Sequence, residues 1–199
     1  MKLFKKLMAV ALAGAMALTV LTGCGSVVNQ KELFSVIKDV TQGMANGEGE
    51  IVQGDGTFAK QAFNLTKTYA ENHQSYLKEH PYYNPYGYDA IQRIVSGAAV
   101  NDPNDPRYTD LAGLRAIVPA GSRDAYYVSC VEVKDYQSKY MTENQMFELA
   151  MKLIQMSIDV QINQNRADGD LGDTTTVHLY SGRIAEKNYV FMVTVVAAK

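Results

Sequence analysis

The first 24 residues divide into three parts, and they decide how much of the chain is left to fold. Lys2, Lys5 and Lys6 form a basic start. An apolar run follows from Leu7 to Leu21, and small residues then precede Cys24. This order of basic, apolar and small residues is typical of an export signal that is removed from the mature protein. The alternative is a retained transmembrane anchor, but the apolar run is shorter than the about 20 residues that a spanning helix needs.

The end of this segment reads Leu21-Thr22-Gly23-Cys24. It resembles the lipobox of bacterial lipoproteins, in which the cysteine is diacylated and the signal is cut just before it. The resemblance covers the first 24 residues only, and the mature domain is not assigned to any family. It implies a signal peptide at residues 1–23, lipidation at Cys24 and a protein that is anchored to the cell membrane on its extracytoplasmic face. Two acyl chains suffice for stable anchoring.

The composition restricts what the mature chain can bind and what stabilises it. The full sequence has a net charge of −2, and loss of the three signal lysines makes the mature chain more acidic. An acidic chain does not favour nucleic acid as a partner. Of the two cysteines, Cys24 is assigned to the lipid, so Cys130 has no partner for an intramolecular disulfide. Residues 24–29 are expected to form a short lipidated linker, and residues 30–199 have the length of one domain.

The first half of the mature chain is expected to be mainly helical. Asn29 is placed to cap a helix over residues 30–44, with Glu32 at capping-box spacing. Residues 47–56 contain four glycines and three acids and are expected to form a loop. A second helix is expected to run from Thr57 to just before Pro81. Its apolar stripe recurs at steps of three and four residues: Phe58, Ala62, Leu65, Tyr69, His73 and Tyr76.

The second half adds strands, after a short helix over residues 90–100 that Asp89 can cap. Residues 111–118 fit neither a helix nor a strand clearly. Residues 125–134 are rich in Tyr and Val and predict a strand. Thr142 and Gln145 have capping-box spacing at the start of a long helix, whose expected apolar face is Met146, Leu149, Ala150, Leu153, Ile154 and Ile158.

Residues 174–185 and 189–196 predict a hairpin that turns at residues 186–188, with the last strand central because it is almost wholly apolar. The predicted fold class is therefore α+β. A helical N-terminal half precedes a β-α-β-β unit with a small, mostly antiparallel sheet and a C-terminal hairpin.

The candidate catalytic residues are few and poorly spaced. His73 and His80 are two helical turns apart, which is too far for a shared zinc ion, and His73 falls in an apolar stripe. Cys130 lies in the middle of a predicted strand, where a buried inert thiol is the common outcome. Ser122 lacks the Gly-x-Ser-x-Gly pattern of a nucleophile elbow. No catalytic residue, cofactor or metal site is therefore predicted.

Two acidic segments have the carboxylate spacing that calcium sites use. One contains Asp102, Asp105 and Asp110, and the other contains Asp168, Asp170 and Asp173. Neither matches an EF-hand loop, and both fit ordinary turn chemistry. No calcium site is predicted at either segment.

The most unusual segment after the lipobox is rich in tyrosine. Residues 81–88 read Pro-Tyr-Tyr-Asn-Pro-Tyr-Gly-Tyr. The side chains of Tyr82, Tyr83, Tyr86 and Tyr88 offer flat amphipathic faces at low entropic cost, as sugar and peptide sites do. The opposing interpretation is that these rings only cover the end of the preceding helix.

The sequence thus favours a non-enzymatic lipoprotein of the cell envelope. It would bind an envelope protein or a cell-wall polymer, with the tyrosine-rich segment as the predicted contact. Two alternatives stay open, a hydrolase whose site is hidden from sequence spacing and a small-solute-binding lipoprotein. The chain is short for the usual two-lobed solute-binding protein.

Overall fold

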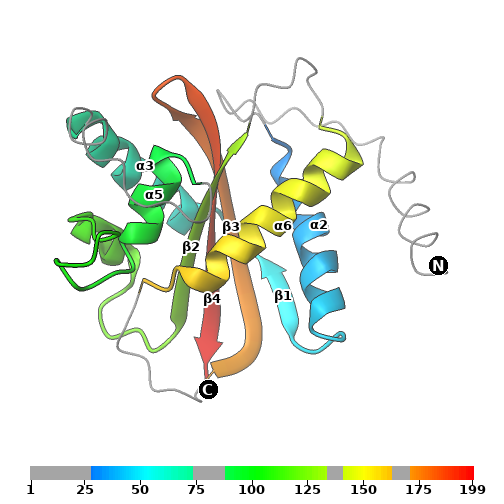
Figure 1. Ribbon diagram of the computed structural model, residues 1–199. Coiled ribbons are helices and arrows are strands. Elements are labelled where there is room, and N and C mark those ends of the chain that lie inside the picture. The colour runs from blue at the N-terminus through cyan, green and yellow to red at the C-terminus, as the bar shows by residue number, and fades with distance from the viewer. Residues whose placement is uncertain (1–27, 74–87, 134–140, 163–170) are drawn as a thin grey trace.

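A mixed sheet with strand order β1-β3-β4-β2 forms the centre of the fold (Figure 1). The computed structural model describes residues 28–73, 88–133, 141–162 and 171–199. Its elements are α2 (Gln30–Met44), β1 (Glu50–Gln53), α3 (Thr57–Asn72), α5 (Ala90–Gly97), the 3-10 helix η1 (Ala112–Ile117), β2 (Ala125–Val133), α6 (Glu143–Asp159), β3 (Leu171–Ile184) and β4 (Lys187–Ala198). This architecture confirms the predicted α+β class, with helices in the first half and a C-terminal hairpin.

Strand β4 lies inside the sheet, between β3 and β2, and is antiparallel to both. Its residues from Tyr189 to Val193 are all buried, as expected for an almost wholly apolar central strand. The β3–β4 turn consists of Ala185 and Glu186, both with positive φ, rather than the predicted residues 186–188. Positive φ at two successive residues is the conformation of a tight hairpin turn, and neither residue type signals it in the sequence.

The prediction of a simple loop over residues 47–56 was wrong, because the segment contains β1. Residues Glu50–Gln53 pair in parallel with Thr174–Val177 of β3, and Ile51 is buried. Gly49 and Gly56 adopt positive φ on either side of this strand. These glycines therefore allow the chain to turn sharply before and after a very short edge strand.

The helices form two layers on opposite faces of the sheet. Val128 and Cys130 of β2 pack with α3, α5 and η1, whereas Val131 and Val133 of the same strand pack with α2 and α6. Successive strand residues point to opposite faces, so the two hydrophobic clusters lie on opposite sides of one sheet. Figure 1 shows α6 crossing the strands on the side where α2 also lies.

The predicted helix caps are present. The Asn29 side chain accepts hydrogen bonds from the backbone amides of Lys31 and Glu32 at 3.2 and 3.3 Å. Asp89 and Thr142 both form complete capping boxes, with Gln92 and Gln145 respectively. Each cap satisfies amides that the first helical turn leaves without a partner, which fixes the start of α2, α5 and α6.

Two helix faces differ from the predicted ones. In α3 the buried line is Ala59, Ala62, Phe63, Thr66 and Ala70, so the stripe through Phe58, Leu65 and Tyr69 is only half-buried. Alanines let this helix approach the sheet closely. In α6, Ile158 is 70% exposed, and Met156 and Ser157 are buried near the end of the helix instead. The sulfur of Met156 accepts a hydrogen bond from the backbone amide of Cys130, so this last part of the helix faces β2.

The remaining segment predictions have mixed outcomes. Residues 111–118, which fitted no element clearly, contain the 3-10 helix η1. Helix α3 ends at Asn72, and the rest of the predicted second helix lies beyond residue 73, outside the described residues. The short helix α5 ends at Gly97, where an added Cβ would lie only 2.1 Å from the carbonyl oxygen of Arg107. Glycine at that position lets the loop return close to the helix.

Candidate functional site

The packed domain extends to within four residues of the predicted lipidation site. Cys24 itself lies outside the described residues, but Val28 is only 3% exposed and packs with Leu33 and Ile37 of α2. Asn29 then caps that helix. Four residue steps separate Cys24 from the buried Val28, so a fully extended tether spans at most about 14 Å.

Several elements meet at the end of the sheet where α2 begins. Val133 at the end of β2 pairs with Asn188 at the start of β4, beside the β3–β4 turn. Helix α6 follows β2 and also begins at this end, and α2 packs against α6 (Figure 1). The lower ends of the strands, with the C-terminus, lie at the opposite end of the molecule. We call the end with the β3–β4 turn the hairpin end.

The tyrosine-rich segment is described only at its last residue. Tyr82, Tyr83 and Tyr86 lie outside the described residues. Tyr88 is half-buried and packs against the cluster between the sheet, α3 and α5. The Tyr88 ring therefore packs on the hydrophobic core, whereas the end of the predicted preceding helix lies outside the described residues.

Asp89, directly after that segment, connects it to the sheet. One carboxylate oxygen accepts the Gln92 amide at 2.9 Å and caps α5. The other accepts the hydroxyl of Tyr189 on β4 at 2.6 Å. Tyr189 is 2% exposed, so this hydrogen bond satisfies a buried hydroxyl and holds the residue after Tyr88 in place.

Two more charged residues complete this cluster at the hairpin end. Lys187 forms an ion pair with Glu132 at 2.9 Å and lies 3.9 Å from Asp89. The hydrogen bond that Lys187 donates to Glu132 raises the pKa of Lys187. Burial and the Asp89 hydrogen bond raise the pKa of Tyr189, so its hydroxyl stays protonated and acts as a donor. We call Asp89, Glu132, Lys187 and Tyr189 the polar anchor.

Sequence reasoning missed the polar anchor. It identified Asp89 only as a helix cap. A tyrosine in an otherwise apolar central strand was the available signal, because a buried phenol needs a hydrogen-bond partner. The identity of that partner, 100 residues earlier in the chain, is not readable from one sequence.

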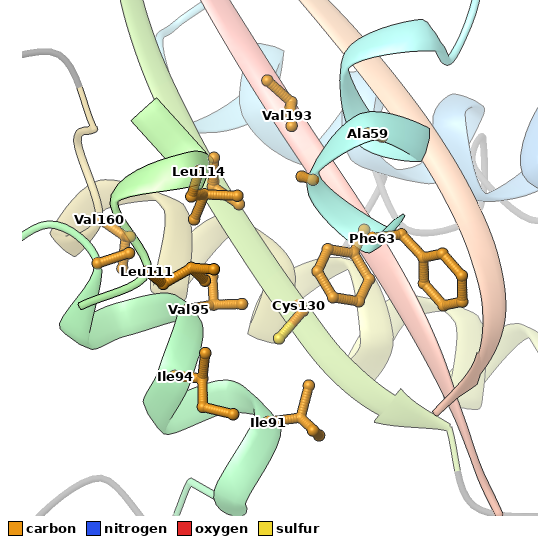
Figure 2. Packing of buried hydrophobic residues seen from close by; sticks show 14 of the residues in the cluster. Ala59, Phe63, Ile91, Ile94, Val95, Leu111, Leu114, Cys130, Val160 and Val193 are labelled. Carbon is orange, nitrogen blue, oxygen red and sulfur yellow. The ribbon is translucent and has the colours of Figure 1, made fainter. Parts of the chain in front are cut away.

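Cys130 is a buried free thiol, as its place in a strand suggested. It is fully buried, and Figure 2 shows its sulfur among apolar side chains that include Ile91, Val95 and Phe63. Burial, with a smaller effect of Asp89, raises its pKa well above the usual value. A buried protonated thiol is a poor nucleophile, so this residue gives the thiol form of the hydrolase hypothesis no support.

The described histidines occupy packed positions. His73 ends α3, where its Nδ1 lies 2.8 Å from the Tyr69 carbonyl oxygen and its ring stacks on Tyr69. His178 on β3 is 7% exposed, with Nδ1 3.2 Å from a carboxylate oxygen of Asp55. Burial lowers the pKa of His178, against the opposing effect of Asp55. His80 lies outside the described residues.

His178 and Asp55 form a histidine–carboxylate pair that the sequence did not predict. Such a pair is one part of a hydrolytic site, but catalysis also needs a nucleophile within reach of the imidazole. Gly54 packs directly on this ring, since an added Cβ would lie 2.5 Å from it, and Phe58 contacts it edge-on. The imidazole is therefore enclosed by packing.

The other candidate residues make local contacts. Ser122 lies 3.4 Å from a carboxylate oxygen of Asp124 and 3.5 Å from the Tyr126 hydroxyl. Asp102 caps its own turn through Asn104. Arg107 binds Asp105 in a two-pronged ion pair and lowers its pKa to about 2.

The first acidic segment is thus engaged in turn chemistry, and Tyr69 donates a hydrogen bond to Asp110. Of the second segment only Asp173 is described, while Asp168 and Asp170 lie outside the described residues. Within the described ranges, no three His, Cys, Asp or Glu side chains come together as a metal-binding group.

Comparison with known proteins gives no relative for this chain, since no family model, curated protein or solved structure matches it. None of the helices in the described part of the chain combines the length and apolar character of a membrane-spanning helix.

The hairpin end contains both Val28, which is buried four residues after Cys24, and Asp89, which directly follows the tyrosine-rich segment. In the polar anchor, the buried Tyr189 hydroxyl donates to Asp89 and Lys187 pairs with Glu132, so Asp89 is held against β4. A binding segment gains affinity when its ends are held in place, because less conformational entropy is lost on binding.

Proposed function

We propose that this protein is an exported lipoprotein, anchored through Cys24 to the extracytoplasmic face of a bacterial membrane, that binds an envelope partner. The observation that carries the proposal is the Leu21-Thr22-Gly23-Cys24 sequence after a basic and apolar segment. The burial of Val28 supports it, because the packed domain reaches to within four residues of the cysteine.

The binding part of the proposal rests on the tyrosine-rich segment and its root. Tyr88 packs on the domain, and Asp89 is fixed by both α5 and Tyr189. Earlier in the chain, α3 ends at Asn72 with His73 stacked on Tyr69, and residues 74–87 lie outside the described residues. The segment is therefore held by the domain at its C-terminal end, and its tyrosines suit a carbohydrate or peptide surface.

The short tether favours a partner close to the membrane. A reach of about 14 Å from the lipidated cysteine keeps the hairpin end near the lipid headgroups. An envelope protein or the membrane-proximal part of a cell-wall polymer fits this placement better than a distant polymer.

Membrane anchoring is tested with a Cys24→Ser variant of the full-length protein. The native protein is expected in the membrane fraction and in the detergent phase after phase partitioning, because two acyl chains hold it there. The variant cannot be acylated, so metabolic labelling with a radioactive fatty acid is expected to mark the native protein and not the variant. Equal fatty-acid labelling of the two proteins would contradict lipidation at Cys24.

Binding is tested by co-sedimentation of the soluble form, starting at Gly25, with purified cell-wall sacculi and with crosslinking in intact membranes. The test variant replaces Tyr82, Tyr83 and Tyr86 with alanine and leaves Tyr88, which packs on the core, unchanged. The matched control replaces the same three residues with phenylalanine, which keeps the rings. Loss of binding or crosslinking in the alanine variant, with at least partial binding in the control, would support the segment as the contact. Equal binding by all three proteins would refute it.

A further inference from the structure

The two helical layers differ in the apolar surface that they expose. Within the described residues, the exposed large hydrophobic side chains are Met44, Phe147 and Ile158, at 59%, 51% and 70%. Met44 belongs to α2 and the other two to α6, so all three lie in the same layer. The layer of α3 and α5 on the opposite face contributes none of them.

Phe147 and Ile158 lie along one line of α6. They are 11 residues apart, close to three full turns, and the half-buried Met151 lies between them on the same side. Residues at such spacing form a continuous stripe on a helix surface. We call Phe147, Met151 and Ile158 the α6 stripe. It is not explained by packing within the domain, because its outermost side chains are exposed.

The tether of the proposed lipoprotein leaves from this same layer. Val28 packs with the hydrophobic cluster between the sheet and helices α2 and α6, together with Met146 and Leu149 of α6. A tether of at most about 14 Å therefore holds the α2/α6 layer, rather than the opposite layer, nearest to the bilayer.

We infer that the α6 stripe rests on the membrane surface, so that the anchored domain lies on its α2/α6 layer. This inference rests on the proposed lipidation of Cys24. The acyl chains supply the affinity, and the stripe orients the domain by placing Phe147 and Ile158 at the interface between headgroups and acyl chains. Glu143, Glu148 and Asp159 on α6 outnumber Lys152, so the contact suits zwitterionic lipid better than anionic lipid.

The orientation has a consequence for the polar anchor and the tyrosine-rich segment. Both are connected to the sheet face that α3 and α5 cover, since Tyr88 and Tyr189 belong to that cluster. A domain lying on α6 thus presents this face away from the bilayer, which leaves it accessible to an envelope partner.

The chain itself provides a clean background for labelling. Cys24 is blocked by acylation under the proposal, and Cys130 is fully buried. A single added cysteine at Gln155, which is exposed and one turn from both Met151 and Ile158, therefore carries a fluorophore at the stripe. The matched control is Lys60→Cys on the exposed side of α3, on the opposite layer. Two helix–sheet packing distances, about 20 Å in total, separate the two layers.

The test uses full-length lipidated protein in phosphatidylcholine vesicles that contain a spin-labelled lipid quencher. The fluorophore at Gln155→Cys is expected to be quenched severalfold more than the fluorophore at Lys60→Cys. Adding Phe147→Ser and Ile158→Ser is expected to remove this difference while the protein stays on the vesicles. Both side chains are exposed, so these changes should leave the fold intact.

Three results would overturn the inference. The first is equal quenching at the two positions. The second is quenching at Gln155→Cys that the serine changes leave unaltered. The third is that the lipid quencher has no effect, while the fluorophores quench one another more strongly as the density of protein on the vesicles rises. The last result would assign the stripe to a second copy of the chain. Failure of the proposed lipidation is distinguishable, because unacylated protein would not float with the vesicles at all.

Discussion

Replacing Tyr189 with phenylalanine is expected to destabilise the domain and to release Asp89, which directly follows the tyrosine-rich segment, from β4. The change keeps the buried ring and removes only the hydroxyl that donates to Asp89 at 2.6 Å. That carboxylate oxygen then loses a donor, while the second oxygen still caps α5 through the Gln92 amide. The change in stability therefore reports the loss of one hydrogen bond, because the substitution creates no large cavity.

The expected magnitude follows from the charge and burial of the two partners. A hydrogen bond to a charged group contributes about 1.5–3 kcal/mol. The Asp89 side chain is 19% exposed, so water can replace part of the lost interaction. We expect a loss of about 2 kcal/mol in the free energy of unfolding. For a domain of this size that loss corresponds to a decrease in Tm of about 4–8 °C.

Urea unfolding of the soluble form measures this loss. A double-mutant cycle with Asp89→Asn isolates the pair, because asparagine keeps the cap of α5 but removes the charge that faces Tyr189. A coupling energy of at least about 1 kcal/mol is expected. A loss below about 0.5 kcal/mol for Tyr189→Phe, or a coupling energy near zero, would refute the assigned role of this hydrogen bond.

Three further predictions test the packing. Burial lowers the pKa of His178 in the folded protein below its ordinary value of 6.5. As the pH falls, the imidazole therefore binds a proton in the unfolded chain before it does so in the folded chain. The free energy of unfolding should thus decrease as the pH drops from about 7 to 5. In His178→Gln this pH-dependent loss in urea unfolding should be smaller, and an unchanged loss would contradict the assignment. Gly97→Ala places a methyl group 2.1 Å from the Arg107 carbonyl oxygen and 2.5 Å from Thr109, which should cost about 3 kcal/mol in calorimetry; a stability equal to the native one would show that the loop yields freely. Cys130 should react with a thiol reagent at pH 8 only after denaturation, because burial raises its pKa and blocks access; rapid modification of the folded protein would disprove this.

The sequence predicted the elements whose signals are local. Helix α2 begins and ends where Asn29 and the periodic apolar residues placed it. Thr142 and Gln145 located the start of α6 through a capping box that depends only on residues three apart. The central place of β4 also followed from its own composition, because a strand covered on both faces is apolar throughout.

Elements that depend on distant partners were not predictable in this way. Residues 50–53 are too few for a periodic pattern, and β1 exists because Thr174–Val177 lie beside it in parallel. The turn at Ala185 and Glu186 has positive φ at residues that rarely adopt it. In α6, Ile158 fits the periodic face, but the helix ends above β2 and leaves this side chain exposed.

The candidate site shows the same division. The tyrosine-rich segment and the lipobox are readable because each is one continuous stretch of sequence. The hydrogen bond from Tyr189 to Asp89 joins residues 100 positions apart, and that between His178 and Asp55 joins residues 123 apart. Contacts at such separation come from the arrangement of strands, which local patterns do not encode.

The most direct test of the central claim is the mass of the N-terminal tryptic peptide of the protein isolated from bacterial membranes. Lipidation predicts a peptide that begins at Cys24, ends at Lys31 and carries the mass of a diacylglyceryl group on its cysteine. A peptide from the uncleaved N-terminus, or one that contains an unmodified Cys24, would contradict the account.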